Sequence, residues 1–425
     1  MKTKFIMIVL IFLALSRTFS LSYKWELKDA IAQSMSENML LKQKHIDLNQ
    51  KKLAKDRNWN LLLPDLSASI LVSNDLIPDS SVLSGRLGAS LKLKGTLPYQ
   101  FKNLQYLYET ERISYEQAIQ LNIRDIKDFF YQILLVKEQI SLAKEDLALV
   151  EQQYEKTSLL FDSGMASDLD LMALKVNLAN SRPELMTLKN DYASKMFQLK
   201  YLTGLKPDDD LELTGSIVFP KDIISLEELF KLVPDNPDLR KLKEQNMILE
   251  NDRKIAVIQN SVPSLSLEYS YSPRINQPFA ESFTASDSWS NPGSLSISMS
   301  LPLDSLLPGS AGRVGLESID AEISKGQLAF SQLLYTSDMD RSNLINQLAG
   351  IRETLDARIL AVNYSREAYD YTLKSYNEGG VDIQELQRSE TDLQKARVAV
   401  LTETYNYISK IFDLEYLLGI EIIKE

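Results

Sequence analysis

Residue types that commonly perform chemistry are scarce in this sequence of 425 residues. It has no cysteine and a single histidine, His45, in a polar run expected to form a helix surface. One chain therefore cannot build an ordinary structural zinc site, and no nearby motif supports a catalytic triad around His45. The glycine-rich stretch 309–313 lacks the Gly-Lys-Ser/Thr of a phosphate-binding loop. Carboxylates are abundant but scattered, so we expect no enzyme, no metal site and no cofactor.

Two turns place a polar or acidic residue three positions before an acid. The pairs are Ser167 and Asp170 in one turn, and Asp382 and Glu385 in the other. At this spacing the first side chain can accept a hydrogen bond from the backbone N–H of the second residue, whose own side chain can reach back. A glycine before each pair is expected to supply the left-handed backbone that ends a helix. These glycines are Gly164 and Gly379. The pattern predicts two helical hairpins with capped returning helices.

Long helices must position these turns. From Lys102 to about Leu160 the sequence contains no proline or glycine, and its apolar residues recur with a mean spacing of about 3.5 residues. A helix of roughly 59 residues spans about 88 Å. A comparable run extends from about Leu316 to Tyr376. Apolar stripes on two neighbouring faces of the first run predict packing against neighbours on both sides, as in a barrel of helices.

Four segments alternate between apolar and mostly polar residues, as strands with two unlike faces do. They are residues 66–73, 87–94, 265–272 and 294–301. Their length suits a transmembrane β-strand, and their serine-rich faces would line a water-filled lumen. The loops 74–85 and 273–292 would then face the outside. Alternation is equally compatible with a half-buried sheet in a soluble sandwich, so the pattern leaves both alternatives open.

The chain also repeats itself. Residues 161–205 align with residues 376–420 without a gap, and the segment that begins at Pro64 aligns with the one that begins at Pro263. We predict a signal peptide over 1–20, a first helix–strand–strand–helix repeat over 21–205, a connector over 206–222, a second repeat over 223–420 and a short C-terminal tail over 421–425. The first helix is expected to start near Ser34 with Glu37 in a capping box, and its counterpart at Pro237 with Asn236 as cap.

The N-terminus and the charge balance bear on location. Lys2 and Lys4 precede the apolar run 5–15, which is too short for a membrane anchor and fits a secretory signal. The net charge of −11 makes nucleic acid an unsuitable partner. After residue 20 the sequence has no apolar stretch of about 18 residues, so a membrane-inserted chain would have to form a β-barrel. Four strands cannot close one, so several chains must combine theirs.

In this layout the sequence resembles the outer membrane efflux protein family of TolC-like channels. The resemblance covers nearly all of the predicted mature chain. It rests on the duplicated plan, the two hairpin turns 161–171 and 376–386, the Tyr-Leu-Thr-Gly ending at 201–204, and prolines at the helix–strand junctions. These prolines are Pro64, Pro98, Pro263 and Pro302.

The resemblance implies a mixed α and β membrane protein, with a long α-helical coiled-coil barrel, a transmembrane β-barrel with four strands per chain, and a tandem structural repeat. It further implies a homotrimer in outer membrane lipid with a long periplasmic extension. Partners would be a periplasmic adaptor, or membrane fusion, protein and an inner-membrane transporter. The expected function is a passive exit duct for efflux or type I secretion. The alternative is a soluble periplasmic coiled-coil scaffold or adaptor, which would not need four strands with apolar faces.

The resemblance also suggests site residues. In the family, acids just past the turn glycine narrow the periplasmic end of the tunnel and interact with cations, and Asp170 and Glu385 match them by position. Asp168 and Asp382 lie close by, while Arg388 stands where a second acid can occur, so the gate is either salt-bridged or absent. Helix capping explains the same acids equally well. The expected adaptor contact is at the hairpin tips: Gly164, Met165, Gly379 and Gly380.

Overall fold

The structure, a computed structural model, describes residues 22–76, 79–220, 225–234, 237–276, 289–290, 293–303 and 307–423. The predicted signal peptide and the capping role of Asn236 lie outside the described residues. The chain divides into two compact units. Unit 1 holds residues 1–43, 116–236 and 335–425, and unit 2 holds residues 44–115 and 237–334. Among the described residues, no helix has the length and apolar character needed to cross a membrane.

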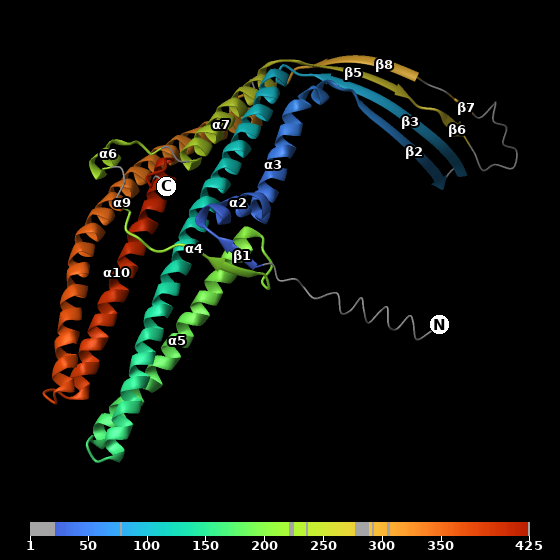
Figure 1. Cartoon of the computed structure of the whole chain (residues 1–425). Coiled ribbons are helices and arrows are strands. Elements are labelled where there is room, and N and C mark those ends of the chain that lie inside the picture. Colours follow the sequence, from blue (N-terminus) through green and yellow to red (C-terminus); the bar gives the residue numbers. More distant parts are fainter. Residues whose placement is uncertain are drawn as a thin grey trace, which may run out of the picture. The chain divides into compact units, whose positions relative to one another are not determined.

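Unit 2 contains a six-stranded antiparallel sheet (Figure 1). Its strands are β2 (Asp65–Leu76), β3 (Asp79–Leu93), β5 (Ser264–Tyr271), β6 (Arg274–Asn276), β7 (Trp289–Ser290) and β8 (Gly293–Ser300). Strand β3 pairs with β2 on one edge and with β5 and β6 on the other, and β8 pairs with β5. Four long strands were predicted, and the two short strands β6 and β7 were not.

The register brings the apolar residues of the four long strands onto one face. Leu66 pairs with Ala89, Leu91 pairs with Leu267, and Leu267 pairs in turn with Ile297. Residues directly opposite one another in a ladder project from the same side of the sheet. This face is not covered within the described chain: Leu66 is 78% exposed and Ile297 is 70% exposed. The sheet therefore presents a broad apolar surface outward.

The opposite face is polar. Arg86 of β3 pairs with Glu268 of β5, with 3.4 Å between Nη2 and Oε1. Serine hydroxyls also meet across the β5–β8 ladder, with Ser266 Oγ 2.6 Å from Ser298 Oγ. Each strand thus has one apolar and one hydrogen-bonding side, as the alternation predicted.

The strand tips differ from the prediction. The segment 74–85 was expected to be a loop, but β2 continues to Leu76 and β3 begins at Asp79, so most of it belongs to the two strands. Polar residues in this segment were misinterpreted as turn residues, although they occupy ladder positions with partners, as in Asn74 opposite Ser81. The described part of the predicted loop 273–292 forms β6 and β7, and the rest of it lies outside the described residues.

Helices of unit 2 support one end of the sheet. Helix α3 (Met39–Asp56) and the 3-10 helix η1 (Asn58–Leu62) lead into β2, and α7 (Pro237–Ser261) leads into β5. Asn251 of α7 donates to the carbonyl of Tyr99 at 2.8 Å, and Asn103 donates to Asp252 at 2.7 Å. Both contacts fix α7 against the start of α4 (Leu97–Asp162). Pro237 is the first residue of α7, as predicted.

Unit 1 contains the two helical hairpins. Helix α4 turns into α5 (Asp168–Thr203), and α9 (Ala311–Asn377) turns into α10 (Ile383–Leu418) (Figure 1). A parallel pair of short strands, β1 (Ser22–Trp25) and β4 (Asp210–Leu213), packs on the first hairpin together with α2 (Leu27–Glu37). The short helix α6 (Leu226–Lys231) packs on the second.

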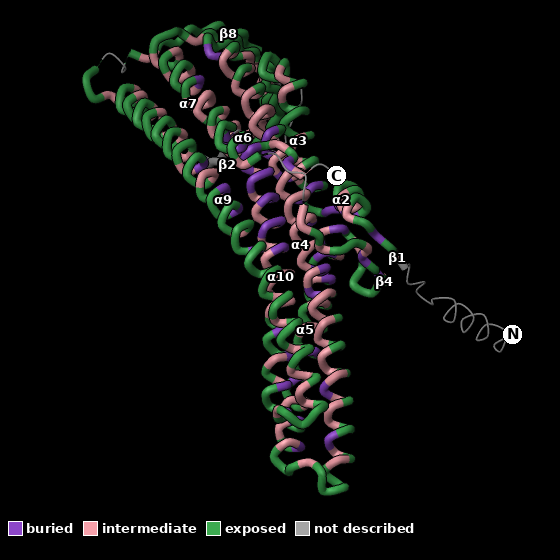
Figure 2. The backbone as a smooth tube through the Cα atoms, turned by 60° about the vertical axis from the view of Figure 1, so that its left-hand side comes forward, coloured by how far each residue is buried: buried purple, intermediate pink, exposed green. Residues whose placement is uncertain are grey.

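Clusters of buried apolar side chains hold this unit together, and Figure 2 marks the buried residues in purple. The first joins Trp25, Ile126, Phe130, Leu199 and Leu213. The second joins Leu229, Ile345, Tyr407, Ile411 and Leu418. Removal of these side chains from water is the main source of stability available to a chain without cysteine.

The predicted start of the first helix is wrong. Helix α2 begins at Leu27, with a capping box between Glu26 and Asp29, and not near Ser34. Ser34 is instead buried and bonds across the core, where its hydroxyl donates to the carbonyl of Leu202 at 2.9 Å. A break at Asn38 separates α2 from α3, and the Asn38 side chain accepts from the N–H of Leu40 at 2.8 Å. Ser34, which was expected to cap a helix, and Asn38 thus join two helices to the first hairpin through the carbonyl of Leu202, while Glu37 accepts from Lys42 at 2.6 Å.

Candidate functional site

The end of the first hairpin contains the capping box expected from the sequence. Gly164 has a φ of +77°, in the left-handed region, and ends the turn after α4. Ser167 Oγ accepts from the N–H of Asp170 at 3.1 Å, and Asp170 Oδ2 accepts from the N–H of Ser167 at 3.2 Å. The helix dipole also favours the charges of Asp168 and Asp170 in this first turn. Capping therefore accounts for the position of Asp170, and whether it also gates remains a prediction.

The second hairpin ends in a similar way. Gly379 has a φ of +74°, and Asp382 accepts from the N–H of Glu385 at 2.9 Å. Glu385 lies in the first turn of α10. Within the described part of the chain, Arg388 forms no ion pair with Glu385. The predicted salt-bridged gate is a ring formed by several chains, so it stays a prediction.

The two hairpin ends lie against each other inside unit 1. Leu174 of α5 packs with Ile383 and Leu386 of α10, and these three side chains are buried. Lys156 of α4 also donates to Asn377 of α9 at 3.2 Å. Beyond this contact the tips are open, since Met165 is 72% exposed and a Cβ on Gly164 or Gly379 would meet no atom within 4 Å. The adaptor contact expected at Gly164, Met165, Gly379 and Gly380 stays a prediction, and at Gly380 a Cβ would lie 2.7 Å from Ser375 Oγ.

A buried carboxyl group further along the hairpins was missed by the sequence analysis. Glu390 of α10 is 4% exposed and accepts from Gln153 Nε2 of α4 at 3.3 Å. Its other oxygen, and the side-chain oxygen of Gln153, are buried without a hydrogen-bond partner. Burial, reinforced by the charge of Asp146, raises the pKa of Glu390 to about 7. Burial and the charge of Glu184 also raise the pKa of Asp146.

A protonated Glu390 suits this site. The carboxylic acid can then accept from Gln153 Nε2 at one oxygen and donate a hydrogen bond from the other. Such a donor would suit the side-chain oxygen of Gln153, which has no hydrogen-bond partner. Only the burial of position 390 reveals this group, because in the sequence Glu390 is one of many helical carboxylates.

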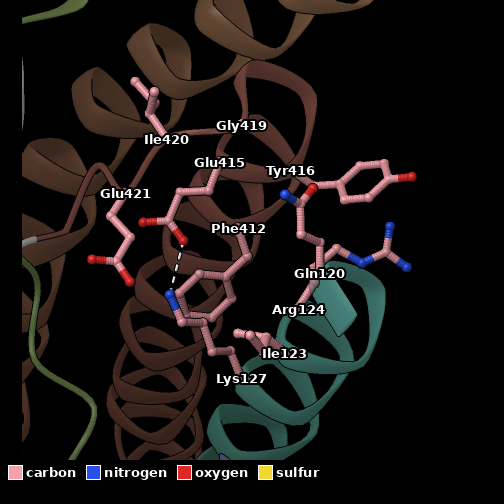
Figure 3. A pocket seen from close by; sticks show the side chains of 10 residues that line it. All are labelled: Gln120, Ile123, Arg124, Lys127, Phe412, Glu415, Tyr416, Gly419, Ile420 and Glu421. Atoms are coloured by element: carbon pink, nitrogen blue, oxygen red, sulfur yellow. Dashed lines mark hydrogen bonds and ion pairs between the residues drawn. The ribbon is translucent and has the colours of Figure 1, made fainter. Parts of the chain in front are cut away.

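A second polar contact joins α4 to α10 at the other end of the hairpin pair. Lys127 Nζ lies 3.0 Å from Glu415 Oε2, in a pocket lined by both helices and the chain after α10 (Figure 3). The other oxygen of Glu415 accepts from the N–H of Ile422 at 2.8 Å. Nearby, Asp128 accepts from the hydroxyls of Tyr405, at 2.8 Å, and Ser409, at 2.9 Å. No pattern in the sequence indicated these pairings, because they join residues 277 to 288 positions apart.

The described residues include no group of three or more His, Asp or Glu side chains placed to hold a metal ion. The arrangement consists of helix caps, a buried proton-binding carboxyl and an internal ion pair. Such groups stabilise the packing of helices.

Comparison with known proteins gives a family match over part of the chain and a shared fold over most of it. Residues 81–205 match the outer membrane efflux protein family. This match falls within the first predicted repeat and confirms the resemblance read from the sequence. No curated protein matches the chain significantly.

Solved structures of outer-membrane channels share this fold over almost the whole chain. The CmeC outer membrane channel of Campylobacter jejuni aligns with a TM-score of 0.76 at 17% identity, over 93% of this chain and 86% of that one. The MtrE outer membrane channel of Neisseria gonorrhoeae, in an open state, aligns with a TM-score of 0.73 at 17% identity, over 93% and 89%. The outer membrane protein VceC of Vibrio cholerae aligns with a TM-score of 0.73 at 14% identity, over 92% and 96%.

The fold is therefore that of the outer membrane efflux channels, with helices predominating and a smaller sheet. The predicted function, an outer-membrane channel of an efflux system, and the predicted outer-membrane location agree with the family match and with this fold. The matched family is one of transport channels, and the alternative of a soluble scaffold finds no support in these comparisons.

Proposed function

We propose that the chain is one subunit of an outer-membrane exit duct that conducts substrates passively from the periplasm to the outside. The observation that carries this proposal is the two-faced sheet of unit 2. Its apolar face includes Leu66, Ile70 and Ile297, which are all strongly exposed, and its other face carries serine hydroxyls and the Arg86–Glu268 ion pair. An apolar surface of this breadth is stable in contact with lipid, and a polar surface is stable in contact with water.

Several chains must contribute to one channel. In the part of the chain that the structure describes, β2 and β8 each pair with a strand on one side only. Backbone groups at such open edges are costly in lipid unless neighbouring strands satisfy them. Helix α9 adds to this argument because most of it is exposed (Figure 2), including Leu328, Tyr335 and Tyr371. A homotrimer with a twelve-stranded barrel and a twelve-helix tunnel would cover these surfaces, and the family resemblance supplies that number.

The tandem repeat fits such an assembly. Helices α4 and α9 have 66 and 67 residues, and α5 and α10 have 36 each. These near-equal lengths support the proposed repeats over 21–205 and 223–420, joined by the connector 206–222. With two equivalent hairpins per chain, a trimeric tunnel would contain six similar helical hairpins.

The transport role implies partners. A passive duct needs an energy source, which an inner-membrane transporter and a periplasmic adaptor would provide. The open hairpin tips support an adaptor contact there, because Met165 and Leu169 expose large apolar side chains at the end of the first hairpin.

Conductance in planar lipid bilayers tests the proposal. The purified full-length protein should insert and give discrete steps of ion current, and it should leave cell envelopes only with detergent. Release from envelopes by salt alone, or purified protein that gives no current in any bilayer, would refute it.

A further inference from the structure

The connection between α3 and β2 exposes a group of apolar side chains outside the sheet. In and after η1, Trp59 is 55% exposed, and Leu61, Leu62 and Leu63 are exposed as well. Strand β2 follows directly, beginning at Asp65 with its apolar face exposed. If the sheet lies in lipid, as the proposed function holds, this connection lies at the membrane–water boundary. Tryptophan is favoured at that depth because its ring is apolar and its N–H is polar.

The same region is basic in an otherwise acidic chain. Residues 51–65 carry four basic and two acidic side chains, and residues 92–102 carry three basic side chains and no acidic one. Lys51, Lys52 and Lys94 are exposed. The net charge of the whole chain is −11, so this local excess of positive charge is a specific feature. Basic residues next to a membrane attract anionic lipid headgroups.

An open cavity of about 430 Å³ lies within this basic region. Lys55 and Asn58 line it from the end of α3 and from η1, and Phe101, Lys102 and Gln105 line it from α4. Lys55 Nζ is 3.9 Å from the ring centroid of Tyr108 and 3.7 Å from Asp56 Oδ1, and these two contacts hold the ammonium group near the cavity. Glu109 also reaches the cavity, but it pairs with Arg112 at 2.7 Å, so its charge is compensated. Two lysines and two carboxamides therefore provide hydrogen-bond donors to an anion beside apolar surface.

The corresponding place in the second repeat differs. The alignment that matches Pro64 with Pro263 pairs residues 51–65 with residues 250–264, which carry two basic and two acidic side chains and no tryptophan. Lys254, the counterpart of Lys55, is exposed. The chain thus offers a matched comparison within itself.

We propose that the Lys55–Lys102 cavity binds the phosphate headgroup of an anionic glycerophospholipid, whose acyl chains lie along the exposed Trp59–Leu63 segment. This inference rests on the proposed function, because it needs the sheet to be in lipid. Neighbouring lysine charges and carboxamide donors suit a phosphodiester, while Trp59 and the three leucines suit hydrocarbon. The occupant would hold the junction of helix and sheet at a fixed depth.

Quenching of Trp59 fluorescence by brominated lipids tests this site. The full-length protein is reconstituted in bilayers that contain brominated phosphatidylglycerol or brominated phosphatidylcholine. The Trp59 contribution is the difference between this protein and its Trp59→Phe variant. We expect phosphatidylglycerol to compete for the site more strongly than phosphatidylcholine, by about fivefold for each participating lysine. Lys55→Gln/Lys102→Gln should abolish the preference. The control Lys243→Gln/Lys254→Gln, which removes two exposed lysines of α7, should retain it.

Each other outcome has a definite meaning. Equal quenching by both lipids in all variants would overturn the headgroup site and leave the proposed function intact. Quenching by neither lipid would mean that the junction does not reach a bilayer, and the proposed function would fail with it. Loss of the preference on addition of inorganic phosphate at constant ionic strength would identify a free anion as the ligand. A loss of oligomer mass in Lys55→Gln/Lys102→Gln without any lipid preference would identify a second copy of the chain as the occupant. Either of the last two results overturns the lipid site.

Discussion

Lys127 and Glu415 form an internal ion pair that ties α4 to α10, with 3.0 Å between Nζ and Oε2. Their side chains are only 13% and 10% exposed. Because Glu415 also accepts from the backbone N–H of Ile422 and Ile423, one carboxylate joins both hairpins to the end of the chain. Loss of one partner of such a pair leaves a charge that is neither hydrated nor compensated.

Lys127→Met should therefore destabilise the protein by about 3 kcal/mol, measured by chemical or thermal unfolding of the detergent-solubilised chain. Lys325→Met removes an exposed pair with Glu322 and should cost less than about 1 kcal/mol. Equal effects of the two substitutions would show that the Lys127–Glu415 pair is no more important than a surface contact.

Glu390 should make stability depend on pH near neutrality. Its pKa in the folded protein is about 7, above the ordinary value of 4.5, so the folded state holds this proton more tightly than the unfolded state. The resulting stability is fully present below pH 4.5 and is lost as the pH rises through 7. Glu390→Gln mimics the protonated acid and should stabilise the protein at pH 8 by about 1–3 kcal/mol, with little effect at pH 5.

Unfolding measured from pH 5 to pH 8 checks this prediction. The exposed Glu353 serves as control, and Glu353→Gln should leave the pH dependence unchanged. A Glu390→Gln protein with the same pH profile as the parent would show that Glu390 is ionised throughout the range.

Gating and capping by Asp170 can be separated. Asp170→Asn removes the charge, but its amide oxygen can still accept from the N–H of Ser167. Ser167→Ala keeps the charge and removes the cap, which typically costs about 1 kcal/mol. If the predicted gate exists, Asp170→Asn combined with Glu385→Gln should weaken block of the channel current by divalent cations, and Ser167→Ala should not. Unchanged block in the first variant would leave capping as the only role of these acids.

Two glycines in the same backbone conformation should respond differently to alanine. Gly204 has a φ of +72°, and a Cβ there would lie 2.8 Å from the Cβ of Glu37. Gly164 has a φ of +77° with no atom in reach. We expect Gly164→Ala to cost about 1–2 kcal/mol from the backbone alone and Gly204→Ala clearly more, since the α2–α5 contact must also shift. Thermal unfolding of the two variants checks this prediction. Equal losses of stability would mean that the α2–α5 contact shifts at no cost in free energy.

Patterns among residues close together in the sequence predicted much of this fold. The long proline-free runs became α4 and α9, the glycines ended the helices, and the alternation fixed which face of each strand is apolar. Each of these features depends on residues close together in the chain. The boundaries at Ser34 and at 74–85 were wrong because a polar residue looks the same locally whether it caps a helix, fills a ladder position or bonds across a core.

The site residues also divide into those that depend on nearby residues in the chain and those that depend on distant ones. The capping box at Ser167 and Asp170 depends on a spacing of three and was predictable. Glu390, Asp128 and the Lys127–Glu415 pair were not, because their environment is created by packing of α4 against α10. The basic junction around Lys55 was visible in composition, but its cavity requires η1 and α4 to be placed together.

Thiol labelling along β5 in intact cells is the most direct test of the claim that the sheet lies in the membrane. The sequence contains no cysteine, so only the introduced cysteine of each variant can react. In the proposed channel, Leu267 and Tyr269 lie on the apolar, lipid-facing side of the sheet, and Ser266 and Ser270 lie on the polar, water-facing side. Single cysteines at 266 and 270 should react with a water-soluble maleimide, and those at 267 and 269 should react only after detergent is added. Equal labelling of all four positions without detergent would contradict a sheet embedded in the membrane.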